Sequence, residues 1–167
     1  GSQMRHVLYT IGELPFATRV RILLDREPFI HHLAQVLAGP PELVWLVDKQ
    51  HPLPADYEPD DLVELINYPS LSLNRPTHQL RQLIIDDLLA MSEAASDSGT
   101  PLLISSTYRS YADQQRIYAY WVDELGQAEA DRVSARPGRS QHQLGTTLDF
   151  GCICPEFADT SAGRWMA

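Results

Sequence analysis

The chain has 167 residues, of which 44% are apolar and 21% are charged, and its formal net charge is −9. This length and composition fit a single globular domain with a core of its own. Because no part of the sequence concentrates lysine and arginine, the negative charge argues against a nucleic-acid-binding function. No apolar run approaches the length of a membrane span.

The first part of the chain, about residues 4 to 40, is predicted to be helical. Residues 1–3, before Met4, have the composition of an expression-tag remnant, so export of the native protein stays open. Apolar residues recur at helical spacing from about residue 4 to residue 40, where Gly39-Pro40-Pro41 breaks the pattern. The apolar run 43–47 then predicts a strand. Residues 59–65 predict a short helix, because acidic side chains are favourable in a first helical turn.

The second half mixes helices and strands. The longest helix is predicted from about residue 78 to residue 96, with Thr77 as its N-cap and Asp87 as the one polar residue on its apolar face. A buried strand follows at 102–106. Further helices are predicted at about 111–125 and 128–133. Because helices and strands do not alternate regularly, the pattern favours an α+β fold over a doubly wound sheet.

The segment after the Pro137-Gly138 turn carries the strongest chemical signal. His142 and Asp149 stand seven residues apart, with Gly145 between them. The apolar neighbours of Asp149 predict that it lies on a buried strand, where a carboxylate is costly unless it is paired or bound to a metal. Imidazole and carboxylate are both zinc ligands, so the pair supplies two of the three protein ligands of a catalytic zinc site. Gly145 is expected at a close backbone approach or a positive φ angle.

The two cysteines, Cys152 and Cys154, are separated by one residue. A disulfide between positions so close would be strained, so we expect unpaired packing residues. The less favoured alternative is that one thiolate is a third zinc ligand.

Three polar residues near this segment have two interpretations each. Arg109 follows the predicted strand and either pairs with a carboxylate such as Asp113 or stabilises negative charge on a substrate oxygen. Ser140 shares a face with His142 if the segment is extended, so its hydroxyl either contacts substrate or caps the turn. Gln114 either holds a substrate amide or lies at the surface. The remaining histidines lack ligand spacing and are expected at solvated positions: His6, His31, His32, His51 and His78.

Two motifs carry a family resemblance. They are Ser106-Thr107-Tyr108-Arg109-Ser110-Tyr111 followed by Gln114, and Ser140-x-His142-x-x-Gly145-x-x-x-Asp149. Together with Leu46-Val47-Asp48-Lys49 and the Leu53–Leu62 segment, they resemble the VanY-like D-alanyl-D-alanine carboxypeptidases. That group also includes D-Ala-D-Ala dipeptidases and LD-carboxypeptidases. The resemblance covers about residues 45 to 165, including Trp165, whereas residues 4–44 match no family that we can name.

The resemblance implies a fold and an activity. The fold would be an α+β zinc D-Ala-D-Ala peptidase with a small antiparallel sheet flanked by helices, at residues 45–167. Residues 1–44 lie outside the resemblance, and their apolar spacing predicts an N-terminal helical extension. The activity would be removal of the C-terminal D-alanine from peptidoglycan stem peptides, with LD-carboxypeptidase activity as a variant. The location would be the cell envelope, the periplasm or the extracellular space.

The same resemblance implies roles for single residues. His142 and Asp149 would be zinc ligands. Arg109 would polarise the scissile carbonyl and stabilise the oxyanion. The substrate contacts would be Ser140, Gln114 and Tyr108.

One part of the family pattern is missing. The family takes its third ligand and its catalytic glutamate from a later Glu-x-x-His segment, whereas after Asp149 this sequence has only Glu156 and no histidine. We therefore expect the chain to be part of a longer protein and to lack C-terminal strands of the domain. Two alternatives stay open. The protein is a non-catalytic peptidoglycan-binding module, or the cysteines or a neighbouring chain complete the zinc site.

Overall fold

The structure is a computed structural model that describes residues 13–152 and 154–167. It divides the chain into two compact units, residues 1–45 and residues 46–167. In the first unit, helices α2 (Phe16–Leu24) and α3 (Arg26–Ala38) are followed by the 3-10 turn η1 (Pro41–Val44). The helical prediction is confirmed from residue 16 to residue 38, and its part at 4–12 lies outside the described residues. The strand predicted at 43–47 is wrong, because Pro41 begins a 3-10 turn there.

The first unit exposes apolar side chains. Helix α2 buries none of its residues. The large apolar side chains that it and α3 leave exposed are Phe16, Leu23, Leu24 and Ile30. No core comparable to that of the second unit involves the described side chains of these two helices.

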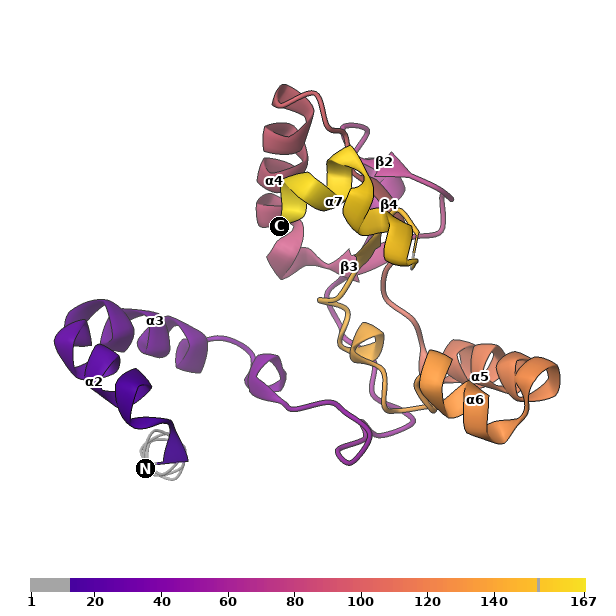
Figure 1. The fold of residues 1–167 in the computed structure, drawn as a ribbon, viewed down its shortest axis with the longest axis horizontal. Helices are drawn as coiled ribbons and strands as arrows, with labels where there is room; N and C mark the ends of the chain where they lie inside the picture. The colour runs from indigo at the N-terminus through magenta and orange to yellow at the C-terminus, as the bar shows by residue number, and fades with distance from the viewer. Residues whose placement is uncertain (1–12, 153) are drawn as a thin grey trace. The chain divides into compact units, whose positions relative to one another are not determined.

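The second unit contains two small sheets (Figure 1). Strand β1 (Leu62–Glu64) pairs antiparallel with β3 (Gln79–Arg81). Strand β4 (Leu103–Ser106) pairs in parallel with β2 (Ser72–Leu73) and antiparallel with β5 (Asp149–Phe150). The predicted mixture of helices and strands is confirmed. The prediction of an antiparallel sheet is correct for two pairings and wrong for the third.

Four helices accompany these sheets, namely α4 (Ile85–Asp97), α5 (Tyr111–Leu125), α6 (Gln127–Val133) and α7 (Ser161–Met166). Helices α5 and α6 lie side by side (Figure 1). Short 3-10 turns occur at Leu65–Asn67, Gln82–Ile84, Gln141–Leu144 and Pro155–Asp159, labelled η2 to η5. Within the described part of the chain, no helix is both long enough and apolar enough to cross a membrane.

Two predicted helices are corrected by strand pairing. The long helix begins at Ile85 rather than near His78, because residues 79–81 form β3, where Leu80 is fully buried. Its buried residues include Ile85 and Leu88, whereas Asp87 is exposed. The segment 59–65 contributes strand β1 rather than a helix. In both places pairing and burial override the local helical pattern.

The core of the second unit fixes the strand that carries Asp149. Its buried members are Leu65, Leu71, Leu80, Ile85, Leu88 and Ile104. Leu148 and Phe150 pack against this cluster from either side of Asp149. Asp149 is thereby held at the edge of the core. The predicted strand is confirmed, but it is half-buried rather than buried, and the Asp149 side chain is 30% exposed.

Candidate active site

The structure brings His142 and Asp149 into contact. The Nε2 atom of His142 lies 3.2 Å from Oδ2 of Asp149, and the two side chains are 13% and 30% exposed. Asp149 stands opposite Ser106 in the β4–β5 pair. His142 lies in the 3-10 turn η4, and its backbone N–H donates to the hydroxyl oxygen of Ser140, the N-cap, at 3.4 Å. The prediction that Ser140 and His142 lie on one extended segment is wrong. Ser140 has extended backbone and is the N-cap, whereas His142 lies inside the turn.

Gly145 ends this turn in a conformation that other residues rarely adopt. Its φ angle is +74°, and a Cβ atom there would lie 2.9 Å from Cγ of Arg81 and 3.1 Å from Cδ2 of Leu62. The backbone carbonyl of Gly145 accepts a hydrogen bond from the Arg81 N–H at 2.9 Å. Both expectations for Gly145 are thus confirmed, and the glycine docks the histidine turn onto β3.

The hydrogen bond of the second ring nitrogen fixes the tautomer of His142. Nδ1 lies 2.8 Å from the carbonyl oxygen of Thr107, which can only accept, so Nδ1 carries the proton. Burial and the nearby Arg109 lower the pKa of His142, although Asp149 and the Thr107 carbonyl oppose this shift. In the neutral ring the lone pair of Nε2 therefore faces the carboxylate of Asp149. Two facing electron-pair donors are the arrangement that a metal cation stabilises.

This pair fits zinc in donor type, tautomer and spacing. Two donor atoms on a tetrahedral zinc ion, with bonds of about 2.0 to 2.1 Å, lie about 3.3 Å apart. The observed separation of Nε2 and Oδ2 is close to that value. Across residues 13–152 and 154–167, no group of three histidine, cysteine, aspartate or glutamate side chains could hold a metal ion. Among the described residues, His142 and Asp149 are therefore candidates for two of the ligands only.

The cysteines differ from the sequence prediction. Cys152 and Cys154 form a disulfide, with their Cα atoms 5.3 Å apart, which is within the span that a disulfide bridges. The expectation of unpaired packing residues is wrong. Since neither sulfur is a thiolate in the structure, the alternative of a cysteine zinc ligand is not supported.

Arg109 lies beside His142 and Asp149 and is held by neutral groups. Its Nη1 donates to Oε1 of Gln114 at 2.8 Å and its Nη2 donates to the hydroxyl of Ser106 at 2.9 Å. Its backbone N–H donates to the carbonyl of His142 at 3.2 Å. Burial lowers the pKa of Arg109, and the charge of Asp149 opposes that shift. An arginine remains protonated in a protein under such a shift, so its charge is available to a ligand.

The predicted ion pair between Arg109 and Asp113 is not formed. Asp113 instead pairs with Arg116 and accepts a hydrogen bond from the hydroxyl of Ser110, the N-cap of α5. The cap draws the Asp113 carboxylate toward the start of its own helix, which explains the difference.

Gln114 lies behind Arg109 rather than at the surface. Its side chain is 1% exposed, and its amide nitrogen donates to the carbonyl of Ala135 at 2.6 Å and to the hydroxyl of Ser134 at 3.3 Å. The surface interpretation is wrong. Because the oxygen and the nitrogen of the Gln114 amide already have partners in the protein, these contacts favour a role in positioning Arg109 over a direct contact with substrate.

The other two predicted substrate contacts occupy different surroundings. Ser140, 7% exposed, lines a cleft of about 430 Å³ together with His142. Tyr108 follows β4, and its backbone N–H donates to the Gln79 carbonyl at 3.0 Å. Burial raises the pKa of the Tyr108 hydroxyl to about 12. Among the described residues, no hydrogen bond joins this hydroxyl to the other predicted site residues.

A buried histidine near the site was expected at the surface. His78 is fully buried, and its ring nitrogens lie 2.9 Å from the hydroxyl oxygen of Thr107 and 2.7 Å from Oδ1 of Asn74. Burial and the charge of Arg75 lower its pKa. Thr107 thus forms a hydrogen bond to His78 through its hydroxyl group and another to His142 through its backbone carbonyl. The signal that could have located His78 is Leu80, which shares its face on an extended strand.

Comparisons with known proteins agree with this geometry. A family model described as VanY, D-alanyl-D-alanine carboxypeptidase, matches residues 77–167. YodJ of Bacillus subtilis (strain 168), a protein named as a carboxypeptidase, is 32% identical over 79% of this chain and 50% of its own length. The chain spans less than two thirds of the length of each curated relative that it matches.

Solved structures show the same likeness. The LD-carboxypeptidase LdcB, whose structure concerns peptidoglycan recognition, is 33% identical with a TM-score of 0.64, over 72% of this chain and 59% of its own. The vancomycin resistance D,D-pentapeptidase VanY, as an E175A mutant in complex with Zn(II), is 26% identical with a TM-score of 0.54, over 72% of each chain. The match to the family model, supported by these structures, shows that this chain belongs to the VanY family of D-alanyl-D-alanine carboxypeptidases.

Proposed function

We propose that the native protein is a zinc carboxypeptidase that releases the C-terminal D-alanine of peptidoglycan stem peptides ending in D-Ala-D-Ala. The observation that carries this proposal is the contact of a neutral His142 with Asp149 at a separation suited to zinc. Membership of the VanY family and the zinc bound to the VanY relative support it. Since peptidoglycan is the proposed substrate, the proposed location is the cell envelope, the periplasm or the extracellular space.

His142 and Asp149 would hold the zinc ion, which when bound acts as a Lewis acid and lowers the pKa of a coordinated water. The Thr107 carbonyl keeps the His142 ring in the tautomer that binds metal. Strand β5 fixes Asp149 against β4. The site as proposed needs a further protein ligand and a general base in addition to His142 and Asp149.

Arg109 would donate hydrogen bonds to the oxygen of the scissile carbonyl and stabilise the charge that develops there. Gln114 and Ser106 orient its guanidinium without neutralising it. Ser140, on the cleft beside His142, would contact the peptide. Tyr108 would contribute a neutral ring and hydroxyl, because its raised pKa keeps it protonated at physiological pH.

Two other functions have an observation in their favour. The 33% identity to LdcB favours LD-carboxypeptidase activity, which uses the same groups on a peptide that ends in an L-residue followed by D-alanine. The presence of only two ligands among the described residues favours a peptidoglycan-binding module without catalysis.

One experiment separates these three functions. The native protein is incubated with a pentapeptide stem ending in D-Ala-D-Ala and with the corresponding tetrapeptide, and released D-alanine is measured by mass spectrometry. Release from the pentapeptide supports the proposal, and release from the tetrapeptide alone supports the LD alternative. Binding of both peptides with no release from either supports the binding module. His142→Ala is the control, and release that survives this substitution contradicts the site assignment.

A further inference from the structure

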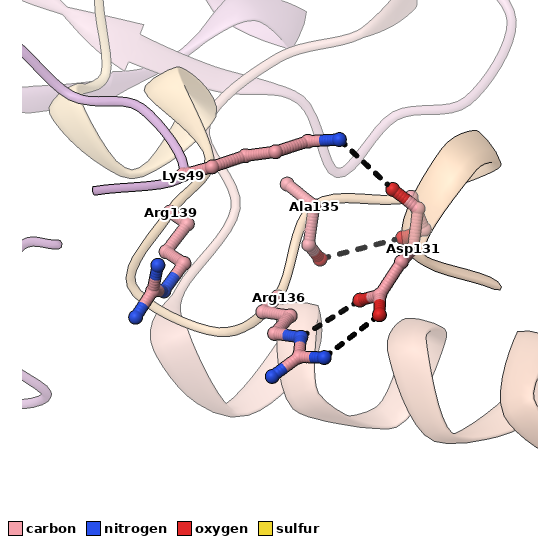
Figure 2. Close-up of a pocket in the computed structure, with 6 residues that line it drawn as sticks. Lys49, Asp131, Ala135, Arg136 and Arg139 are labelled. Atoms are coloured by element: carbon pink, nitrogen blue, oxygen red, sulfur yellow. Dashed lines mark hydrogen bonds and ion pairs between the residues drawn. The ribbon is translucent and has the colours of Figure 1, made fainter. Parts of the chain in front are cut away.

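A basic pocket of about 310 Å³ lies in the second unit (Figure 2). It is lined by Lys49, Asp131, Ser134, Ala135, Arg136 and Arg139. Three of these side chains are cationic and one is a carboxylate, which makes the pocket net positive on a chain whose formal net charge is −9. Charge of this sign at one place on an acidic protein favours an anionic ligand.

The single carboxylate of the pocket is already engaged. Both Nε and Nη2 of Arg136 lie 2.7 Å from the carboxylate oxygens of Asp131, so this pair is bidentate (Figure 2). Asp131 also accepts a hydrogen bond from the hydroxyl of Tyr118. Arg136 is therefore neutralised and forms part of the pocket wall.

The other two cations keep their charge. Nζ of Lys49 donates to the backbone carbonyl of Asp131 at 3.2 Å, a neutral acceptor. In the described part of the chain, no salt bridge within 4.0 Å involves Lys49 or Arg139. Among the residues that the structure describes, Lys49 and Arg139 are therefore two cations of one pocket without an ion-pair partner.

Lys49 and Arg139 come from distant segments that the backbone ties together. The Leu53 N–H donates to the carbonyl of Gly138 at 2.7 Å. Gly138 has a φ angle of +77°, and a Cβ atom there would lie only 2.8 Å from the carbonyl oxygen of Leu53. The turn that carries Arg139 is thereby held against the segment that follows Lys49, so both residues line one pocket, with the Lys49 ammonium directed toward Asp131 and the Arg139 guanidinium toward another side (Figure 2).

This pocket continues into the cleft at the candidate active site. Lys49, Asp131 and Arg139 also line the 430 Å³ cleft to which Ser140 and His142 belong. A peptide bound at His142 thus has the two free cations within the same continuous depression.

We propose that Lys49 and Arg139 bind a second carboxylate of the substrate, on the amino side of the scissile bond. This inference rests on the proposed function and adds a specificity determinant to it. Stem peptides offer two such groups, the free α-carboxylate of a γ-linked glutamate and the side-chain carboxylate of a diamino-dicarboxylic acid at the third residue. The terminal carboxylate is a different group, because it belongs to the residue released beside His142 and Arg109.

The test compares peptides that differ only in these carboxylates. Binding constants and kcat/KM are measured for the native protein with a stem peptide ending in D-Ala-D-Ala, with its α-amidated glutamate form, and with a form amidated at the third residue. We expect amidation of the recognised carboxylate to weaken binding about tenfold or more, as is typical when a charge-assisted hydrogen bond is lost. The form that loses affinity identifies which carboxylate is bound.

A double variant, Lys49→Gln with Arg139→Gln, supplies the second arm. It should bind the unmodified and the amidated peptides equally, whereas the control Arg116→Gln should discriminate as the unmodified protein does. Arg116 is an exposed arginine paired with Asp113. Equal kcat/KM for all three peptides with the unmodified protein overturns this inference and leaves the proposed function intact. Failure to bind or cleave any of the peptides overturns both.

Discussion

The cleft around Arg109 and the end of helix α6 around Asp131 each hold a guanidinium group, but by opposite means. Arg109 is held by the amide oxygen of Gln114 and the hydroxyl of Ser106, which are neutral acceptors. Arg136 is held by a bidentate carboxylate, Asp131. The first arrangement fixes the direction of the cation and leaves its charge for a ligand, whereas the second consumes the charge.

Burial strengthens this difference. Gln114 is 1% exposed and Ser106 is 7% exposed, so the partners of Arg109 are fixed by the surrounding fold. The Arg136 side chain is 51% exposed, and water screens its ion pair. We therefore expect substitutions around Arg109 to lower kcat and substitutions around Arg136 to have little effect on kcat or stability.

The largest effect is expected from Arg109→Ala. Loss of one donor to a developing oxyanion lowers kcat on the order of 100- to 1,000-fold. Zinc content should not change, because Arg109 is not a ligand. Steady-state kinetics together with elemental analysis check both points, and full activity of the variant would show that Arg109 has no role in catalysis.

A smaller loss is expected from Gln114→Ala, which removes one of the two acceptors that orient Arg109. Removal of such an orienting partner costs about 10- to 100-fold in activity at metal sites. The loss should appear in kcat more than in KM, because Gln114 is buried away from substrate. Gln115→Ala, an exposed neighbour on α5, is the matched control. A Gln114 variant that changes KM alone would indicate a direct substrate contact instead.

The buried histidine His78 predicts that the free energy of unfolding depends on pH. The folded pKa of His78 is lowered by burial and by Arg75, so below pH about 6.5 the unfolded chain takes up a proton at this residue that the folded chain resists. The free energy of unfolding should therefore fall as the pH decreases below about 6.5. Urea unfolding at pH 7.5 and pH 5.5 measures this change. His78→Gln should reduce the loss and His31→Gln, at an exposed position, should not. An equal loss in the His78 variant would assign the effect to other groups.

The smallest effect is expected from Arg136→Gln. Its ion pair with Asp131 is exposed, and such pairs contribute little to stability. The thermal midpoint and kcat should both stay close to those of the unmodified protein, whereas KM should rise if the pocket binds a substrate carboxylate, because Asp131 then loses its cationic partner. A loss of turnover comparable to that of Arg109→Ala would mean that the two guanidinium groups do not differ as the geometry indicates.

The parts of the site that the sequence predicts are those that form over short distances along the chain. His142, Gly145 and Asp149 lie within one segment, and Arg109 follows a strand whose apolar pattern is plain. The helix predicted at 111–125 matches α5, because a serine N-cap and a glycine mark its two ends.

Long-range contacts account for what was missed. The burial of His78 depends on Thr107, and the positioning role of Gln114 depends on the carbonyl of Ala135. Strand β3 looked helical because its pairing with β1 cannot be read from its own residues. The pocket of Lys49 and Arg139 likewise exists only because two distant segments are tied at Gly138.

The most direct test of the account is the zinc content of the native protein and of its His142→Ala variant, measured by elemental analysis after dialysis without chelator. We predict about one zinc ion per chain in the native protein and almost none in the variant, because the neutral Nε2 of His142 is one of the ligands. Equal zinc in the two proteins would contradict the assignment of His142 and Asp149 as the metal site.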